Sequence, residues 1–139
     1  MKLDVLIVDD SATIRALITK ALRLSVPDLG DVHEASDGIA TLAMLADHTV
    51  DLVLMDINMP RLNGMQLLKR LRDNPKLSTL PVVVISTEGS QERLAELDEF
   101  GIAGYLRKPF RPEQLRQVVN QIMEFSDDGK PQEPDGGDF

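Results

Sequence analysis

The hydrophobic residues of this chain fall into short continuous runs that alternate with longer stretches in which apolar residues recur at helical spacing. The continuous runs are strongest at Leu3–Val8, Val50–Met55 and Pro81–Ile85. Runs of this length, followed by polar turn residues, are typical of strands buried on both faces of a parallel sheet. Two shorter and more polar segments, Asp31–Ala35 and Ala103–Leu106, have the character of edge strands.

The stretches between these strands predict five helices. The first two have apolar faces made by Ile14, Leu17, Ile18, Ala21 and Leu22, and by Ile39, Leu42, Ala43 and Ala46. The others are expected within 67–71, 90–100 and 115–123. Strands alternating with helices predict an α/β fold, a doubly wound five-stranded parallel sheet with right-handed crossovers. Placing the most apolar strands at the centre gives the strand order 2-1-3-4-5.

Composition excludes several classes of protein. The net charge of −8 argues against nucleic-acid binding, which depends on Lys and Arg neutralising phosphates. The absence of cysteine excludes disulfides and thiolate metal sites. An acid at position 4 interrupts any signal peptide, and no apolar run reaches membrane-spanning length. We therefore expect a cytoplasmic protein with no membrane or nucleic-acid partner.

The chain divides into two parts of different composition. Residues 1–125 carry all the strand and helix patterns and form the expected domain. Residues 126–139 contain two prolines, three glycines, five acids and one lysine, with almost nothing apolar. Such a segment cannot bury enough surface to order itself, so it is predicted to be a disordered acidic tail or a linker.

Polar residues follow the central strands at one edge of the predicted sheet. Asp9 and Asp10 end the first strand and Asp56 ends the third, its neighbour; Ser86 and Lys108 follow the fourth and fifth. Singly, these residues are typical of helix caps, turns and solvated lysines. Together, three carboxylates repel one another. Lys108 would offset one negative charge, and a hard divalent cation such as Mg²⁺ would offset the remainder.

The motifs at this edge resemble the receiver domain of two-component response regulators. The matching segments are Val8–Ser11, Asp56–Pro60, Ser86 and Tyr105–Phe110, and the likeness covers about residues 1–125. Each motif alone is weak, but the set in this order and spacing is specific. In size the chain resembles the stand-alone chemotaxis regulators of the CheY type. The resemblance implies a flavodoxin-like, CheY-like fold and a signalling module rather than an enzyme.

The resemblance also assigns the chemistry of the site. It implies that Asp56 is the phosphoacceptor, which receives a phosphoryl group from a sensor histidine kinase or a phosphotransfer protein. Asp10, Asp56 and the backbone carbonyl of Asn58 would bind Mg²⁺ directly, and Asp9 would hold a metal-bound water. An aspartyl phosphate formed this way is a covalent strategy that carboxylate nucleophiles support.

Other residues acquire regulatory roles by the same resemblance. Lys108 would pair with the phosphoryl group, and Ser86 would hydrogen-bond to it. The peptide bond between Lys108 and Pro109 would be cis. Ser86 and Tyr105 would switch the surface formed by the fourth helix, fifth strand and fifth helix, where a downstream protein binds. Asn58 and Glu88 would control the water that removes the phosphoryl group. The implied protein is a monomer, or a dimer on phosphorylation.

Alternatives remain open at this point. The chain could be the receiver part of a longer regulator, or an intermediate in a phosphorelay. A flavodoxin-type protein is disfavoured because Asp9 and Asp10 would repel a flavin phosphate. An aspartate-nucleophile phosphatase of the haloacid dehalogenase type is disfavoured because its Asp-x-Asp spacing is missing. His33 and His48 have no ligand-spaced partners, so surface roles are expected for them.

Overall fold

The computed structural model describes residues 2–59, 63–87 and 90–127, with side chains through residue 122. Five parallel strands form one sheet in the order β2-β1-β3-β4-β5. The strand bounds are β1 Leu3–Val8, β2 Leu29–Ala35, β3 Leu52–Met55, β4 Val82–Ser86 and β5 Gly104–Arg107. The strand order predicted from the sequence is confirmed.

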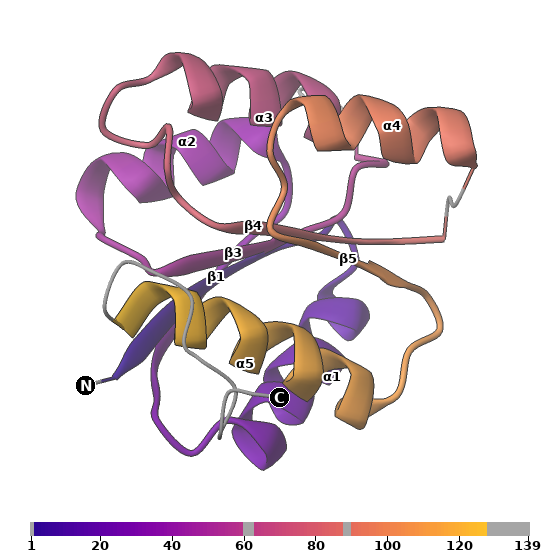
Figure 1. Cartoon of the computed structure of the whole chain (residues 1–139). Helices are drawn as coiled ribbons and strands as arrows, with labels where there is room; N and C mark the ends of the chain where they lie inside the picture. Colours follow the sequence, from indigo (N-terminus) through magenta and orange to yellow (C-terminus); the bar gives the residue numbers. More distant parts are fainter. Residues whose placement is uncertain (1, 60–62, 88–89, 128–139) are drawn as a thin grey trace.

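Helices cover both faces of the sheet (Figure 1). Their bounds are α1 Ala12–Ser25, α2 Gly38–Asp47, α3 Gly64–Asp73, α4 Gln91–Glu99 and α5 Pro112–Asp127. In the figure, α1 and α5 lie below the sheet, and α2, α3 and α4 lie above it. The core is accordingly divided into two clusters, one on each face, and both are closed by strand side chains that alternate in direction.

The helices begin at short polar side chains that satisfy free backbone N–H groups. Ser11 caps α1 by accepting a hydrogen bond from the Ile14 backbone N–H, and Asp37 does the same for α2. Asn63 and Gln66 form a reciprocal capping box at the start of α3. Because Ser11 is the cap of α1, the Asp9 and Asp10 side chains are not used for capping and stay available at the sheet edge.

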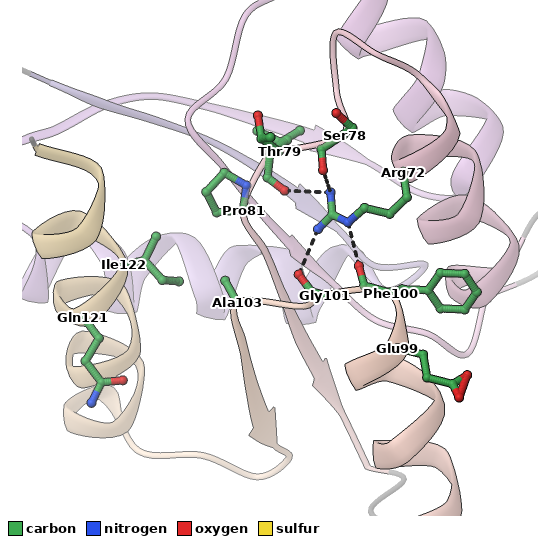
Figure 2. A pocket seen from close by; sticks show the side chains of 11 residues that line it. Arg72, Ser78, Thr79, Pro81, Glu99, Phe100, Gly101, Ala103, Gln121 and Ile122 are labelled. Carbon is green, nitrogen blue, oxygen red and sulfur yellow. Dashed lines mark hydrogen bonds between the residues drawn. The ribbon is translucent and has the colours of Figure 1, made fainter. Parts of the chain in front are cut away.

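One arginine fastens the loops at the opposite edge of the sheet, where the strands begin (Figure 2). Arg72, near the end of α3, donates hydrogen bonds to five carbonyl oxygens, those of Leu77, Ser78, Leu80, Phe100 and Gly101. These carbonyls belong to the loops that precede β4 and β5. Partial burial lowers the pKa of the Arg72 guanidinium. This side chain therefore joins three segments far from the acidic edge.

The structure corrects two details of the sequence interpretation. Leu17 and Ile39 were expected on buried helix faces, but they are 56% and 52% exposed. Ala43 and Ala46, expected on the same face as Ile39, are exposed as well. Gly38 and Thr41 are the buried residues of α2, and the Thr41 hydroxyl donates to the Asp37 carbonyl. The expected Leu42 is partly buried and packs against the core with Ala40, Met44 and Leu45. The predicted tail begins within the last turn of α5, and its residues 128–139 lie outside the described part of the chain. None of the described helices is both long and apolar enough to span a membrane.

Candidate functional site

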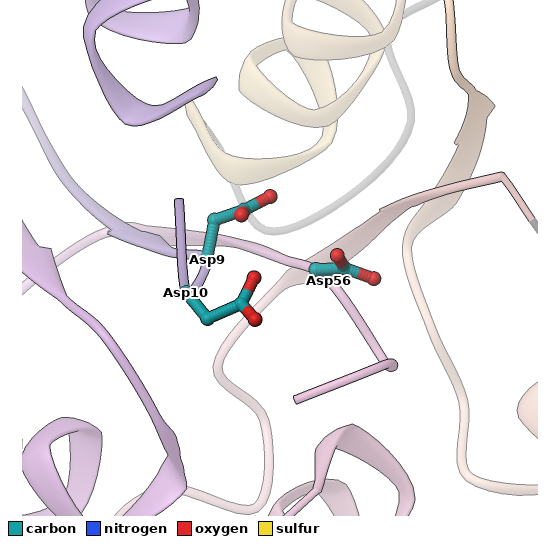
Figure 3. A group of neighbouring side chains, drawn as sticks. All are labelled: Asp9, Asp10 and Asp56. Carbon is teal, nitrogen blue, oxygen red and sulfur yellow. The ribbon is translucent and has the colours of Figure 1, made fainter. Parts of the chain in front are cut away.

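Three carboxylates meet where β1 and β3 end (Figure 3). The strand pairing continues one residue past each strand, because the Asp56 N–H donates to the Val8 carbonyl and the Asp9 N–H donates to the Ala35 carbonyl. This places Asp9, Asp10 and Asp56 so that one oxygen from each lies within 4.8 Å of the others. Asp9 and Asp56 are buried and Asp10 is exposed, so the cluster opens to solvent on the side of Asp10.

Lys108 directly follows β5, an edge strand of the sheet, and its side chain reaches the acidic cluster. Its backbone N–H donates to the Ser86 carbonyl, which extends the pairing of β4 and β5 and brings the side chain to the same edge. The Lys108 Nζ lies 2.8 Å from Asp9 Oδ2 and 3.1 Å from Asp56 Oδ2. The peptide between Lys108 and Pro109 is cis, as the resemblance implies.

Lys108 holds its proton firmly in this position. Partial burial of the ammonium works against its charge, but hydrogen bonds and charge attraction from Asp9 and Asp56 outweigh that effect. The pKa of Lys108 is therefore raised above its ordinary value. At neutral pH the site contains one fixed cation facing three carboxyl groups, which leaves a negative excess.

The residues present fit a hard divalent cation. Lys108 uses one oxygen each from Asp9 and Asp56, and the other oxygens accept backbone N–H bonds of 2.9 Å from Ser11 and 3.0 Å from Asn58. A carboxylate has about four acceptor positions, so both groups retain free lone pairs. The Asp10 carboxylate makes no hydrogen bond or ion pair within the described part of the chain. All-oxygen donors with excess negative charge favour Mg²⁺ or a similar ion.

The other predicted site residues lie beside this cluster. Ser86 is fully buried at the end of β4, and the Asn58 side-chain amide lies 3.4 Å from its hydroxyl oxygen. Tyr105 is half-buried on β5, its hydroxyl oxygen is shielded from solvent, and its side chain packs against the core beneath α4. Glu88 lies outside the described residues. The roles assigned to these four residues stay predictions.

Two arrangements escaped the sequence interpretation. Arg15 in α1 donates to the Asp9 carbonyl at 2.6 Å and to Glu34 of β2 at 2.8 Å, behind the acidic cluster. The rings of His33 and His48 lie with centroids 4.5 Å apart, although the two residues are distant in sequence. The position of Arg15 one helical turn after Ser11 was the available signal, since it places the side chain near the start of α1.

We expect Lys108→Met to lower the free energy of unfolding at neutral pH by roughly 3 kcal/mol, because it leaves buried carboxylates uncompensated. The folded-state pKa of Lys108 is raised above 10.5, so the stabilisation is fully present below that pH. It is lost as the pH rises through the raised pKa. Urea unfolding in chelator, from neutral to alkaline pH, measures both effects. Lys20→Met, at an exposed position of α1, is the control, and equal stability of the Lys108 variant and the parent would contradict the prediction.

Comparison with known proteins identifies a family whose sequence pattern this chain matches. Residues 5–120 match the family described as the response regulator receiver domain. Chemotaxis protein CheY-3 of Vibrio cholerae is 38% identical over 122 residues, which cover 86% of this chain and 91% of that protein. The chemotaxis response regulator CheY4 of Vibrio cholerae is similar in structure, with a TM-score of 0.79 and 31% identity over 88% of this chain and 99% of that one. The Mn²⁺-bound form of response regulator Rcp1 has a TM-score of 0.72 at 28% identity over 88% of this chain and 93% of that one.

Proposed function

The chain belongs to the response regulator receiver family, and we propose that Asp56 is the residue that carries its phosphoryl group. One observation carries this assignment. Asp56 ends β3, the middle strand of the sheet, where it pairs with Lys108 at 3.1 Å and lies beside Asp9 and Asp10. A nucleophile for phosphoryl transfer needs positive charge around it more than covalent help, and this site offers that arrangement.

The proposed reaction moves a phosphoryl group between two side chains. A carboxylate oxygen of Asp56 attacks phosphorus in line, the P–N bond of a phosphohistidine breaks, and the imidazole leaves with its electron pair. Asp10, Asp56 and the Asn58 carbonyl would hold Mg²⁺, with Asp9 contributing through a water. When bound, Mg²⁺ would neutralise charge on the phosphoryl oxygens. Lys108 and Ser86 would bind the transferred group after it reaches Asp56. The ammonium of Lys108 would then pair with the phosphoryl group in place of the free Asp56 carboxylate.

Support for the metal comes from the donor set. Three carboxylates facing a single lysine leave a negative excess that a divalent cation would offset. The related regulator Rcp1 has been solved with Mn²⁺, an ion that uses the same oxygen ligands. The decisive experiment is phosphoryl transfer to the purified protein from a phosphohistidine donor or a small acyl phosphate. Labelling with Mg²⁺ and none in excess chelator is expected; robust labelling in chelator would remove the metal assignment.

The same preparation separates the rival functions. A flavodoxin-type protein would carry a coloured flavin, and an aspartate-nucleophile phosphatase would turn over a generic phosphate monoester. We expect a colourless protein that forms a stoichiometric acyl phosphate and does not release phosphate from monoesters. The names of the relatives favour a role in chemotaxis. The proposed location, the cytoplasm, is the one expected from the sequence. A phosphotransfer profile against the kinases of the same organism would identify the pathway, including a phosphorelay.

We further propose that phosphorylation is communicated through the α4-β5-α5 surface to a downstream protein. Among the described residues of α4, only Leu97 is fully buried, so the helix opens at low cost. Ser86 ends β4 and Tyr105 lies in the adjacent strand, paired with Val84. Movement of Ser86 toward the phosphoryl group would change the space available to Tyr105. This is a shift between two packings, driven by contacts that exist only with the phosphoryl group bound.

Amide hydrogen exchange tests this surface. With Mg²⁺ and beryllofluoride as a phosphoryl mimic, we expect protection to change most within Gly89–Tyr105, because α4 is weakly held and follows Ser86 in the chain. Gly89 itself lies outside the described residues. Size-exclusion chromatography of the same samples measures whether the monomer expected for the free protein becomes a dimer. Exchange differences confined to α1 and α2 would contradict the proposal. Asp56→Ala, which removes the acceptor, is the control and should show no response.

A further inference from the structure

Arg15 lies directly behind the acidic cluster without touching any of its carboxylates. Its Nη1 donates to the backbone carbonyl of Asp9 at 2.6 Å, and its Nε donates to Glu34 at 2.8 Å. The Arg15 side chain is 17% exposed and its bond to the Asp9 carbonyl is partly buried, whereas the Glu34 side chain is 48% exposed, so that end of the arrangement lies at the surface. A planar guanidinium can make both bonds at once, and it thereby joins α1, the end of β1 and the edge strand β2.

The carbonyl that Arg15 holds belongs to the peptide unit linking Asp9 to Asp10. A peptide unit is planar, so fixing its carbonyl also fixes the direction in which the chain enters Asp10. The Asp9 side chain has further anchors in Lys108 and the Ser11 N–H. Asp10 is exposed, and its carboxylate has no hydrogen bond or ion pair to the rest of the described chain. The orientation of the Asp10 carboxylate therefore depends on its backbone.

We propose that Arg15 is a positioning residue for the cation site, which holds the Asp9–Asp10 peptide so that the Asp10 carboxylate faces the other two. The inference rests on the proposed function, in which Asp10 binds Mg²⁺ directly. Groups that orient ligands from behind are worth about 10- to 100-fold in metal affinity at other sites. Glu34 completes the arrangement by neutralising the guanidinium and fixing its plane.

The geometric effect of Arg15 can be separated from its charge because the two have opposite signs. A positive charge near the cluster repels a cation, so removing only the charge should tighten Mg²⁺ binding. Loss of the paired hydrogen bonds from the guanidinium to the Asp9 carbonyl and to Glu34 should instead weaken Mg²⁺ binding. Arg15→Lys keeps the charge but cannot bond to Asp9 and Glu34 with the same planar geometry. Arg15→Gln removes both the positive charge and the paired hydrogen bonds of the guanidinium.

Calorimetric titration of the unphosphorylated protein with MgCl₂ tests the proposal. We expect the Mg²⁺ dissociation constant to rise about tenfold in Arg15→Lys. It should rise at least as much in Arg15→Gln, although that variant has lost a positive charge. Thermal melting in chelator, recorded in parallel, reports whether each variant is folded. An unchanged constant in Arg15→Lys, or tighter binding in Arg15→Gln, would overturn the positioning role.

Arg72→Lys is the matched control. Arg72 is also a partly buried arginine bonded to backbone carbonyls, but at the opposite edge of the sheet (Figure 2). Its replacement should lower the melting temperature and leave the Mg²⁺ constant unchanged. If Arg72→Lys weakened Mg²⁺ binding equally, the Arg15 effect would be general loss of stability, and the proposal would fail. Absence of Mg²⁺ binding by the parent protein would instead count against the proposed function itself.

Discussion

Replacing Asp56 with alanine should abolish phosphoryl labelling. Asp56 ends β3, the middle strand of the sheet, and Lys108 pairs with it as well as with Asp9. The family resemblance assigns the acceptor role to Asp56 and a metal-bound water to Asp9, so a second acceptor of comparable rate is not expected. Intact mass spectrometry after incubation with an acyl phosphate and Mg²⁺ measures the loss, and circular dichroism shows that the variant is folded. Labelling of Asp56→Ala at the parent rate would place the acceptor elsewhere.

The neighbouring acids supply graded controls for the same experiment. Asp10→Ala should weaken Mg²⁺ binding more than Asp9→Ala, because the Asp10 carboxylate makes no hydrogen bond or ion pair with any described residue and is free to bind the ion. Asp9 is already bonded to Lys108 and to the Ser11 N–H. Both variants should still accept a phosphoryl group at Asp56, at reduced rates and higher Mg²⁺ concentrations. A stronger metal defect in Asp9→Ala would reverse the assignment of direct ligand and water holder.

The strand order and the meeting of the acids could be predicted from the sequence because they follow from topology. Three runs of mostly apolar residues need cover on both faces, which places them at the centre of the sheet. Once the first and third strands are neighbours, residues that follow them must lie side by side. Asp9, Asp10 and Asp56 therefore come together whatever their side-chain conformations. The family resemblance added roles to these residues, but the adjacency needed only the pattern of strands.

Features set by side-chain reach could not be predicted in the same way. Arg15 and Glu34 are separated in sequence, and the choice of the Asp9 carbonyl as acceptor depends on the rotamer of a long side chain. The exposure of Leu17 and Ile39 depends on the rotation of each helix about its axis, which one apolar stripe fixes only approximately. Ser11, rather than a neighbouring Asp, caps α1 because of the backbone conformation at that residue.

The lifetime of the phosphorylated state should depend on Asn58. This residue lies two positions after Asp56, it is exposed, and its amide nitrogen lies 3.4 Å from the Ser86 hydroxyl oxygen. A small polar side chain between the acceptor and Ser86 can admit and orient water for attack on phosphorus. An apolar chain such as methionine would exclude that water. Glu88, outside the described residues, is expected to act in the same way.

Asn58→Met and Glu88→Leu should therefore each lengthen the phosphorylated lifetime severalfold. The measurement is the decay of phosphoryl label on purified protein, with the donor removed and Mg²⁺ kept saturating. Asn120→Met serves as the matched control for the Asn58 variant, because Asn120 is an exposed asparagine of α5 away from the acidic cluster, and it should decay at the parent rate. Saturating Mg²⁺ matters because a variant with weaker metal binding would also decay slowly. If both variants lose the label as fast as the parent, these side chains do not control the attacking water, and a rapidly resetting signal loses its structural basis.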